Sequence, residues 1–123
     1  MHKSCRWGEI GWLVGVLVIG ALARLWAIGH DLPFVYYGDE LHMMSRSLGF
    51  GTGDLNPHWF HKPALYMYII FFEYGVYYVV GRIFGLFPNV DAFAVHYFRD
   101  PTVFALLGRL TSAFCGLGCV VVV

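Results

Sequence analysis

The segment YYGDELHMMSRSLGFGTGDLNPHWFHKP, residues 36–63, is the one long polar segment in a strongly apolar sequence. It opens with the acid pair Asp39-Glu40 and closes with His61-Lys62-Pro63. Four of the chain's six histidines lie in this segment or shortly before it, at positions 30, 42, 58 and 61. Acids, imidazoles and a lysine gathered within membrane-like sequence predict a functional site that the flanking segments hold at a membrane surface.

The composition on either side of this segment is that of an integral membrane protein. Of the 123 residues, 59% are hydrophobic and 13% are charged, whereas a soluble domain carries about 25% charged residues. Eight basic and eight acidic residues balance, so the charge gives no indication of a nucleic-acid partner. The three cysteines form no even set, which argues against a disulfide framework. We therefore expect an all-α integral membrane protein in contact with a lipid bilayer.

Two apolar runs are long enough to predict transmembrane helices, because about 20 helical residues cross the hydrocarbon core. The first run covers residues 10–28, and the second covers 104–123 and is cut short at its C-terminal end. Lys3 and Arg6 favour an inside amino terminus. A cleaved signal peptide, with Ala21-Leu22-Ala23 as the cleavage site, is an alternative interpretation of the first run. We expect the N-terminal part of a multi-pass protein in a plasma or inner membrane.

The segment between the two runs, residues 29–103, is then predicted to be an extracytoplasmic loop that carries surface helices. A helix over about 40–48 has one apolar and one polar face, which is typical of helices lying along a membrane. Residues 64–84 are apolar enough to span, but Glu73 lies at their middle and their tyrosines favour an interface. Spanning and surface positions therefore both stay open for this helix. Residues 82–100 are expected to form a mixed connector.

The acid pair has two interpretations from its residues alone. Asp39 stands where a helix N-cap would stand, and Glu40 suits the positive end of the helix dipole. Alternatively, the pair takes part in chemistry: Asp39 can act as a base that takes a proton, and the cations Lys62 and Arg46 can stabilise a developing negative charge. His61 adds an imidazole, which is a common ligand of zinc.

The order of the short motifs resembles the dolichyl-phosphate-mannose protein mannosyltransferase-like family and the bacterial transferases that move aminoarabinose onto lipid A. The resemblance implies a C-type membrane glycosyltransferase fold, of which this chain would be an N-terminal part that is inactive by itself. It also implies transfer of a sugar from a polyprenyl-phosphate donor to a protein or lipid acceptor, at the outer face of the membrane. The motifs that carry it are Gly38-Asp39-Glu40, the helix to Leu48, Gly53-Asp54-Leu55-Asn56-Pro57, His61-Lys62-Pro63 and Arg109-Leu110-Thr111-Ser112-Ala113.

The resemblance also implies roles for individual residues. Asp39, the first residue of the acid pair with Glu40, matches the aspartate that activates the acceptor. Lys62 matches the lysine of a Glu-Lys-Pro element associated with the lipid phosphate, and Arg46 is the second candidate for phosphate binding. His61 stands in place of that element's glutamate, a metal ligand, so a divalent metal at His61 is an open expectation. The resemblance favours a surface position for the helix over residues 64–84.

Two other classes of protein fit the same sequence. One is a small membrane subunit or packing partner without catalytic activity, which a stop codon directly after Val123 would favour. The other is a metal-binding module on the outer surface, built on the histidines, which the metal content of the purified protein would test.

Overall fold

A computed structural model describes the backbone of residues 3–122 and the side chains of residues 8–122. The regular elements in this part of the chain are all helices, as the sequence predicts. Three of them are long and apolar enough to cross a membrane: Gly8–Leu25, Ala64–Ile83 and Thr102–Val122. The side chains of Lys3 and Arg6, on which the predicted orientation rests, lie outside the described ones. The chain divides into two compact units, residues 1–30 with 109–123 (unit 1) and residues 31–108 (unit 2).

Unit 1 contains helix α1, Lys3–Leu25, and the larger part of helix α5, Thr102–Val122. The prediction that the first helix extends to residue 28 is wrong, because turns replace the helix after Leu25. Arg109 explains this ending: its Nη1 donates to the carbonyl oxygens of Ile28, at 2.9 Å, and His30, at 2.8 Å. The side chain thus supplies hydrogen bonds to two carbonyl groups that follow the helix and receive none from a further helical turn.

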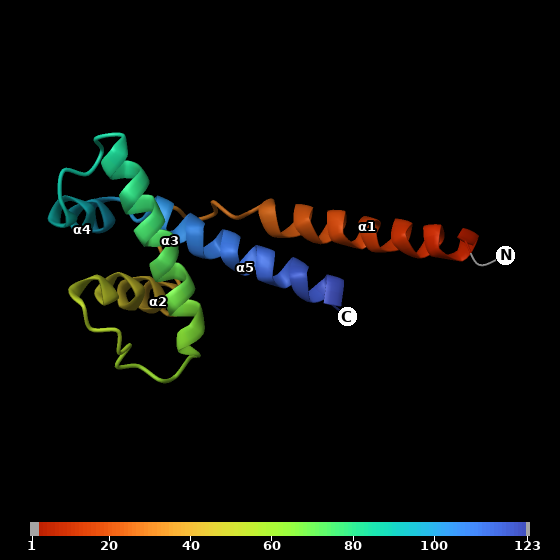
Figure 1. Cartoon of the computed structure of the whole chain (residues 1–123), viewed down its shortest axis with the longest axis horizontal. Helices are drawn as coiled ribbons and strands as arrows, with labels where there is room; N and C mark the ends of the chain where they lie inside the picture. Colours follow the sequence, from red (N-terminus) through yellow and green to blue (C-terminus); the bar gives the residue numbers. More distant parts are fainter. Residues whose placement is uncertain (1–2, 123) are drawn as a thin grey trace. The chain divides into compact units, whose positions relative to one another are not determined.

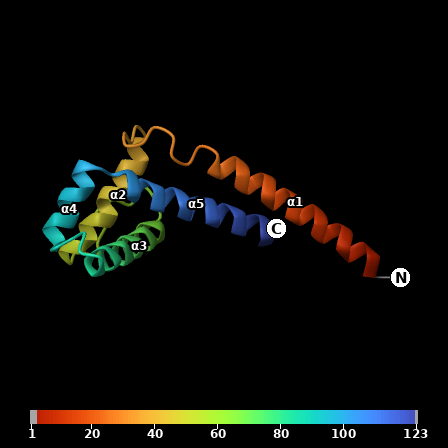
Figure 2. The ribbon, with the colours of Figure 1, turned by 90° about the horizontal axis from the view of Figure 1, so that it is seen from above.

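Unit 2 is built around helix α3, Ala64–Ile83, against which helix α2, Gly38–Gly49, packs. Both views show these two helices side by side (Figure 1 and Figure 2). The sequence predicts both helices to within two residues at each end. A 3-10 turn, Phe50–Thr52, follows α2 and ends at Gly53, whose φ of 94° is the left-handed conformation that glycine adopts without strain.

A further helix, α4 (Val90–Arg99), occupies the segment that the sequence predicts to be a connector. Asn89 begins it, and its side-chain oxygen accepts a 2.7 Å hydrogen bond from the backbone N–H of Ala92. Asparagine is among the strongest N-caps, so this cap was a readable signal for the helix. The connector prediction is therefore wrong over these residues.

The core of unit 2 joins residues of α2, α3, α4 and the first turn of α5. Burying such large apolar side chains stabilises a fold by about 1.5–3 kcal/mol each. The aromatic members meet mostly edge to face or tilted, the arrangement that ring quadrupoles favour. The cluster consists of Met44, Ile70, Tyr74, Phe87, Phe93, Tyr97, Phe104 and Ala105.

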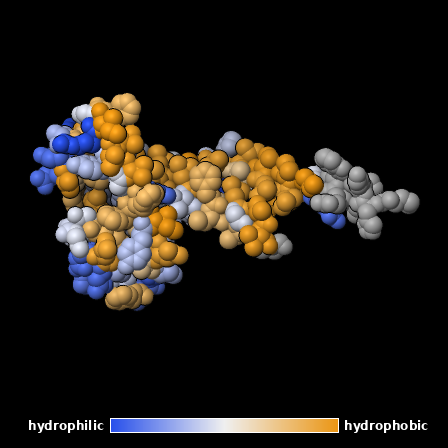
Figure 3. Space-filling view, in the orientation of Figure 1, coloured by the Kyte–Doolittle hydropathy of each residue, from blue (hydrophilic) through white to orange (hydrophobic). Residues whose placement is uncertain are grey.

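The opposite face of α3 is apolar and exposed. Its residues recur at intervals of three or four, so they form one stripe along the helix. Figure 3 shows apolar side chains over part of α3 and polar side chains gathered beside them, toward α4. The stripe consists of Leu65, Ile69, Phe72, Val76, Val79 and Ile83.

The end of α3 is a Schellman motif that returns the chain onto the helix. The N–H of Leu86 bonds the carbonyl of Gly81 at 2.7 Å and that of Gly85 bonds Arg82 at 3.2 Å, with Gly85 at a φ of 76°. This turn places the ring of Phe87 directly over Gly81, where an added Cβ would overlap with it. A glycine is therefore needed at position 81 for the ring of Phe87 to pack against the backbone of α3.

Two glycines of α3 give a matched test of this packing. We expect Gly81→Ala to lower the free energy of unfolding by about 1–3 kcal/mol, the usual effect of overfilling a core. Gly75→Ala should raise it by up to ~1 kcal/mol, since alanine is the better helix former and nothing lies within 4 Å of a Cβ there. Denaturant unfolding in detergent measures both, and equal effects of the two substitutions would contradict the close contact.

Candidate functional site

Asp39 and Lys62 form an ion pair in unit 2. The sequence predicts a role for each of them in the same site, but not their contact. Lys62 Nζ donates to Asp39 Oδ2 at 2.6 Å. Asp39 lies in the first turn of α2, and Lys62 lies just before Pro63 and the start of α3. The contact therefore joins both ends of the polar segment across 23 positions. Both side chains remain accessible, with 67% of Asp39 and 40% of Lys62 exposed.

Asp39 is not the N-cap of α2, and that part of the prediction is wrong. The helix begins at Gly38 after Tyr37, and no side chain caps it. Asp39 lies two positions beyond Tyr37, which occupies the N-cap position, so it cannot cap the first free N–H groups, and its carboxylate binds Lys62 instead. Asp39 and Glu40 both stand in the first turn, where negative charge interacts favourably with the helix dipole.

The electrostatic surroundings of Asp39 favour its charged form. The hydrogen bond and charge of Lys62 lower the pKa of the carboxyl below its usual value, and His42 and His61 add smaller effects in the same direction. Asp39 is therefore ionised at neutral pH. A carboxylate with a lowered pKa is also a weaker base, so the same lysine that holds the group reduces its power to take a proton.

Three aromatic rings lie beside the ion pair, and the central one was missed from the sequence. The ring centroids of His42 and Trp59 are 5.6 Å apart, and those of Trp59 and His61 are 6.1 Å apart with nearly parallel planes. Trp59 is half-buried, while both histidines are exposed. In the sequence, the one indication that Trp59 belongs to the site is its position two residues before His61. The indole thus organises two imidazoles within electrostatic reach of Asp39.

Arg46 anchors the loop that leads to Lys62. Its Nη1 donates to the carbonyl oxygen of Pro57 at 3.0 Å, and Pro57 is buried. Within the loop, Asp54 accepts from the backbone N–H of Asn56 at 2.9 Å and meets His58 Nε2 at 2.7 Å. Arg46 keeps further guanidinium donors beyond the one used here, so its proposed contact with phosphate stays a prediction.

Among the described side chains, His61 has no surrounding group of metal ligands. Within residues 8–122, no three histidine, cysteine, aspartate or glutamate side chains gather closely enough to hold a metal ion. A protein site for a divalent transition metal has at least three such ligands. A divalent metal at His61 stays a prediction, and no step of the mechanism below depends on it.

Comparisons of the chain with protein-family models, with curated proteins and with solved structures found no match. The resemblance to membrane mannosyltransferases therefore stays a prediction from short motifs. The side chains of unit 2 carry what can be inferred about function: an accessible acid, a lysine bound to it, and a row of aromatic rings beside them.

Proposed function

We propose that the chain belongs to the machinery of a membrane glycosyltransferase that moves a sugar from a polyprenyl-phosphate donor to a hydroxyl of a protein or lipid acceptor. The observation that carries the proposal is the 2.6 Å contact between Asp39 and Lys62. Sugar transfer from a lipid phosphate needs a base for the acceptor and a cation for the leaving group. In support, the contact brings a carboxylate and an ammonium group together at an accessible position, and Glu40 lies in the same helical turn.

In the proposed reaction, Asp39 accepts the proton of the acceptor hydroxyl. The acceptor oxygen forms a bond to the anomeric carbon of the sugar as the bond from that carbon to the phosphate oxygen breaks. The electron pair of the broken bond stays on the polyprenyl phosphate, where the Lys62 ammonium stabilises the added charge. Arg46 is the proposed second cation. The step needs no oxidant or further reactant.

In the proposed reaction, Lys62 exchanges one anionic partner, the Asp39 carboxylate, for another, the phosphate of the donor. While Lys62 is bound to Asp39, the carboxylate is a weak base. A lipid phosphate that takes the ammonium removes the hydrogen bond and the charge that lower the pKa of Asp39. Its pKa then rises toward the ordinary value of about 3.9, and the adjacent phosphate charge raises it further. Donor binding thereby increases the basicity of Asp39.

A titration of the Asp39 carboxyl by ¹³C NMR in micelles tests this exchange. In the free protein the titration midpoint should lie below the ordinary pKa of an aspartate carboxyl, because Lys62 lowers it. The stability that the pair contributes is then present above the unfolded pKa and lost as the pH falls through the lower folded value. Polyprenyl phosphate should raise the midpoint.

Lys62→Met should raise the midpoint by itself and abolish the response to the lipid. Polyprenol, which lacks the phosphate, is the control ligand. An unchanged midpoint with polyprenyl phosphate would mean that Lys62 only fixes the loop, and the proposal would fall.

We place α3 along the membrane surface, with its exposed apolar stripe toward the lipid. Support comes from the core, where Met44 of α2 and Tyr97 of α4 join Tyr74 near the middle of α3. Both partner helices expose charged residues: Asp39 in α2, and Asp91 and Arg99 in α4. A spanning α3 would carry such charges into hydrocarbon, at about 2.5–3.5 kcal/mol each.

Single cysteines on either side of α3 test this placement without assuming the orientation of the chain. With Cys5, Cys115 and Cys119 replaced by serine, we expect Thr52→Cys and Leu86→Cys to react alike with an impermeant maleimide on intact cells. Both positions are exposed and flank the helix. Labelling of one in intact cells and of the other only after lysis would make α3 a spanning helix.

A further inference from the structure

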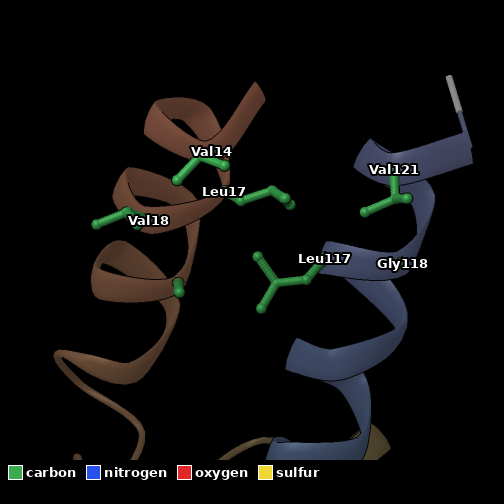
Figure 4. Close-up of a pocket in the computed structure, with 7 residues that line it drawn as sticks. Val14, Leu17, Val18, Leu117, Gly118 and Val121 are labelled. Atoms are coloured by element: carbon green, nitrogen blue, oxygen red, sulfur yellow. The ribbon is translucent and has the colours of Figure 1, made fainter. Parts of the chain in front are cut away.

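Unit 1 contains an apolar groove between its two helices. The cavity has a volume of about 410 Å³. In Figure 4, Leu17 of α1 and Leu117 of α5 point into the space between the two ribbons. The groove has no polar side chain in its lining, which consists of Val14, Leu17, Val18, Ala21, Leu117, Gly118 and Val121.

A cation lies at one end of this groove. Arg24 follows Ala21 by one helical turn, and its Nη1 is 3.4 Å from the carbonyl oxygen of Gly20. Its guanidinium also lies against Gly116 of α5, where an added Cβ would be only 2.9 Å from Nε. Among the ion pairs of the described side chains, none includes Arg24. An arginine near the end of a membrane helix extends its guanidinium toward the lipid headgroups, where this group can meet an anionic partner.

The length and direction of the groove match one leaflet of a bilayer. From Arg24 to Val14 the helix rises by roughly 15 Å, at 1.5 Å per residue. Half of the hydrocarbon core is also about 15 Å thick. Arg24 stands at the edge of the apolar span Gly8–Leu25, so its charge is near the boundary while the groove extends toward the bilayer centre. This is how a phospholipid lies in its leaflet, with the phosphate at the boundary and the chain inward.

We propose that this groove binds one acyl chain of an anionic phospholipid and that Arg24 pairs with the lipid's phosphate. The apolar lining accepts hydrocarbon, and the guanidinium supplies the donors that bind phosphate oxygens. Gly116 leaves the space in which the guanidinium lies. The residues of this groove do not include Asp39 or Lys62, and the proposal does not depend on the proposed sugar transfer.

The charge distinguishes this occupant from another helix. A transmembrane helix with its side chains is about 10–12 Å across, and an apolar one would leave the guanidinium of Arg24 without a counter-charge. An anionic lipid covers the same surface and supplies that charge. A second copy of the chain on this face is the alternative outcome of the test below.

Native mass spectrometry of the chain, released from vesicles of equal phosphatidylglycerol and phosphatidylcholine, tests the proposal. We expect one retained phospholipid, with phosphatidylglycerol favoured about fivefold, the preference that one basic side chain gives an anionic lipid. Ala21→Phe, which fills the groove, should reduce retention of both lipids. Leu22→Phe is the matched control, because this neighbouring residue is 64% exposed and does not line the groove.

Variants at Arg24 distinguish binding of the lipid headgroup from binding of the acyl chain. Arg24→Gln should keep a retained lipid but lose the preference for phosphatidylglycerol, and Arg24→Lys should restore the preference. Gly118→Leu fills the groove from the other helix, and circular dichroism checks that each variant folds. Equal retention of the two lipids by the natural chain, equal retention by Ala21→Phe and Leu22→Phe, or a lipid-free dimer would each overturn the proposal.

Discussion

Asp39→Asn lowers sugar transfer by about 10²–10⁴-fold, the usual contribution of a general base, if donor and acceptor meet at the ion pair. Asparagine cannot take a proton near neutral pH, yet it keeps the size of the side chain and a hydrogen-bonding oxygen for Lys62. The assay follows labelled sugar from polyprenyl phosphate to the acceptor fraction, in membranes from cells that express the whole open reading frame to which this chain belongs. Glu40→Gln is the control, since it changes the neighbouring acid in the same turn and should cost far less.

The result distinguishes a base from a structural ion pair because the two roles affect different measurements. An exposed ion pair contributes little to stability, so Asp39→Asn and Lys62→Met should both leave the melting temperature nearly unchanged. A structural role predicts near-normal transfer in both variants. A catalytic role predicts a large loss in both, with Lys62→Met also weakening donor binding. A stable Asp39→Asn protein with normal transfer would remove Asp39 from the mechanism.

Phe104→Ala destabilises unit 2 by about 3–5 kcal/mol, the usual cost of truncating a buried phenylalanine. Its side chain is 0% exposed. Its ring meets five others, those of Tyr74, Tyr77, Phe93, His96 and Tyr97. The substitution leaves a cavity at the point where three helices meet, which the surrounding rings fill only in part. Denaturant unfolding in detergent, followed by circular dichroism, measures the loss.

Phe98→Ala provides the matched control for this experiment. Phe98 is 80% exposed, so its removal should change the unfolding free energy by no more than about 0.5 kcal/mol. Phe104→Leu keeps much of the volume and should fall between the two, which preserves a measurable variant if Phe104→Ala does not fold. Equal effects of Phe104→Ala and Phe98→Ala would contradict the core assignment.

The long elements were predictable from the sequence because apolar periodicity and glycine punctuation determine them locally. Helices α2 and α3 follow from such patterns, and Gly49 and Gly53 indicate where α2 ends. The end of α1 was not predictable, since it depends on Arg109, some 80 positions away. Helix α4 was missed because its ten residues are mixed in polarity, although Asn89 is a residue type that favours the start of a helix.

The site was predictable as a set of residues but not as an arrangement. Asp39, Lys62 and His61 stand out by residue type within an apolar chain. Their contacts require the loop to return to α2, which Arg46 secures by binding the carbonyl of Pro57. Trp59 was overlooked because aromatic residues are common in this chain, at 19%, and only the fold shows that it joins two histidines.

The position of Trp59 gives unit 2 an intrinsic optical probe. It is the only tryptophan among residues 31–108; the other three precede residue 30. With those three changed to phenylalanine, the tryptophan fluorescence of the chain would come from one indole in contact with His42 and His61. A molecule that displaces either imidazole changes the emission, so ligands can be screened by light without knowing the reaction.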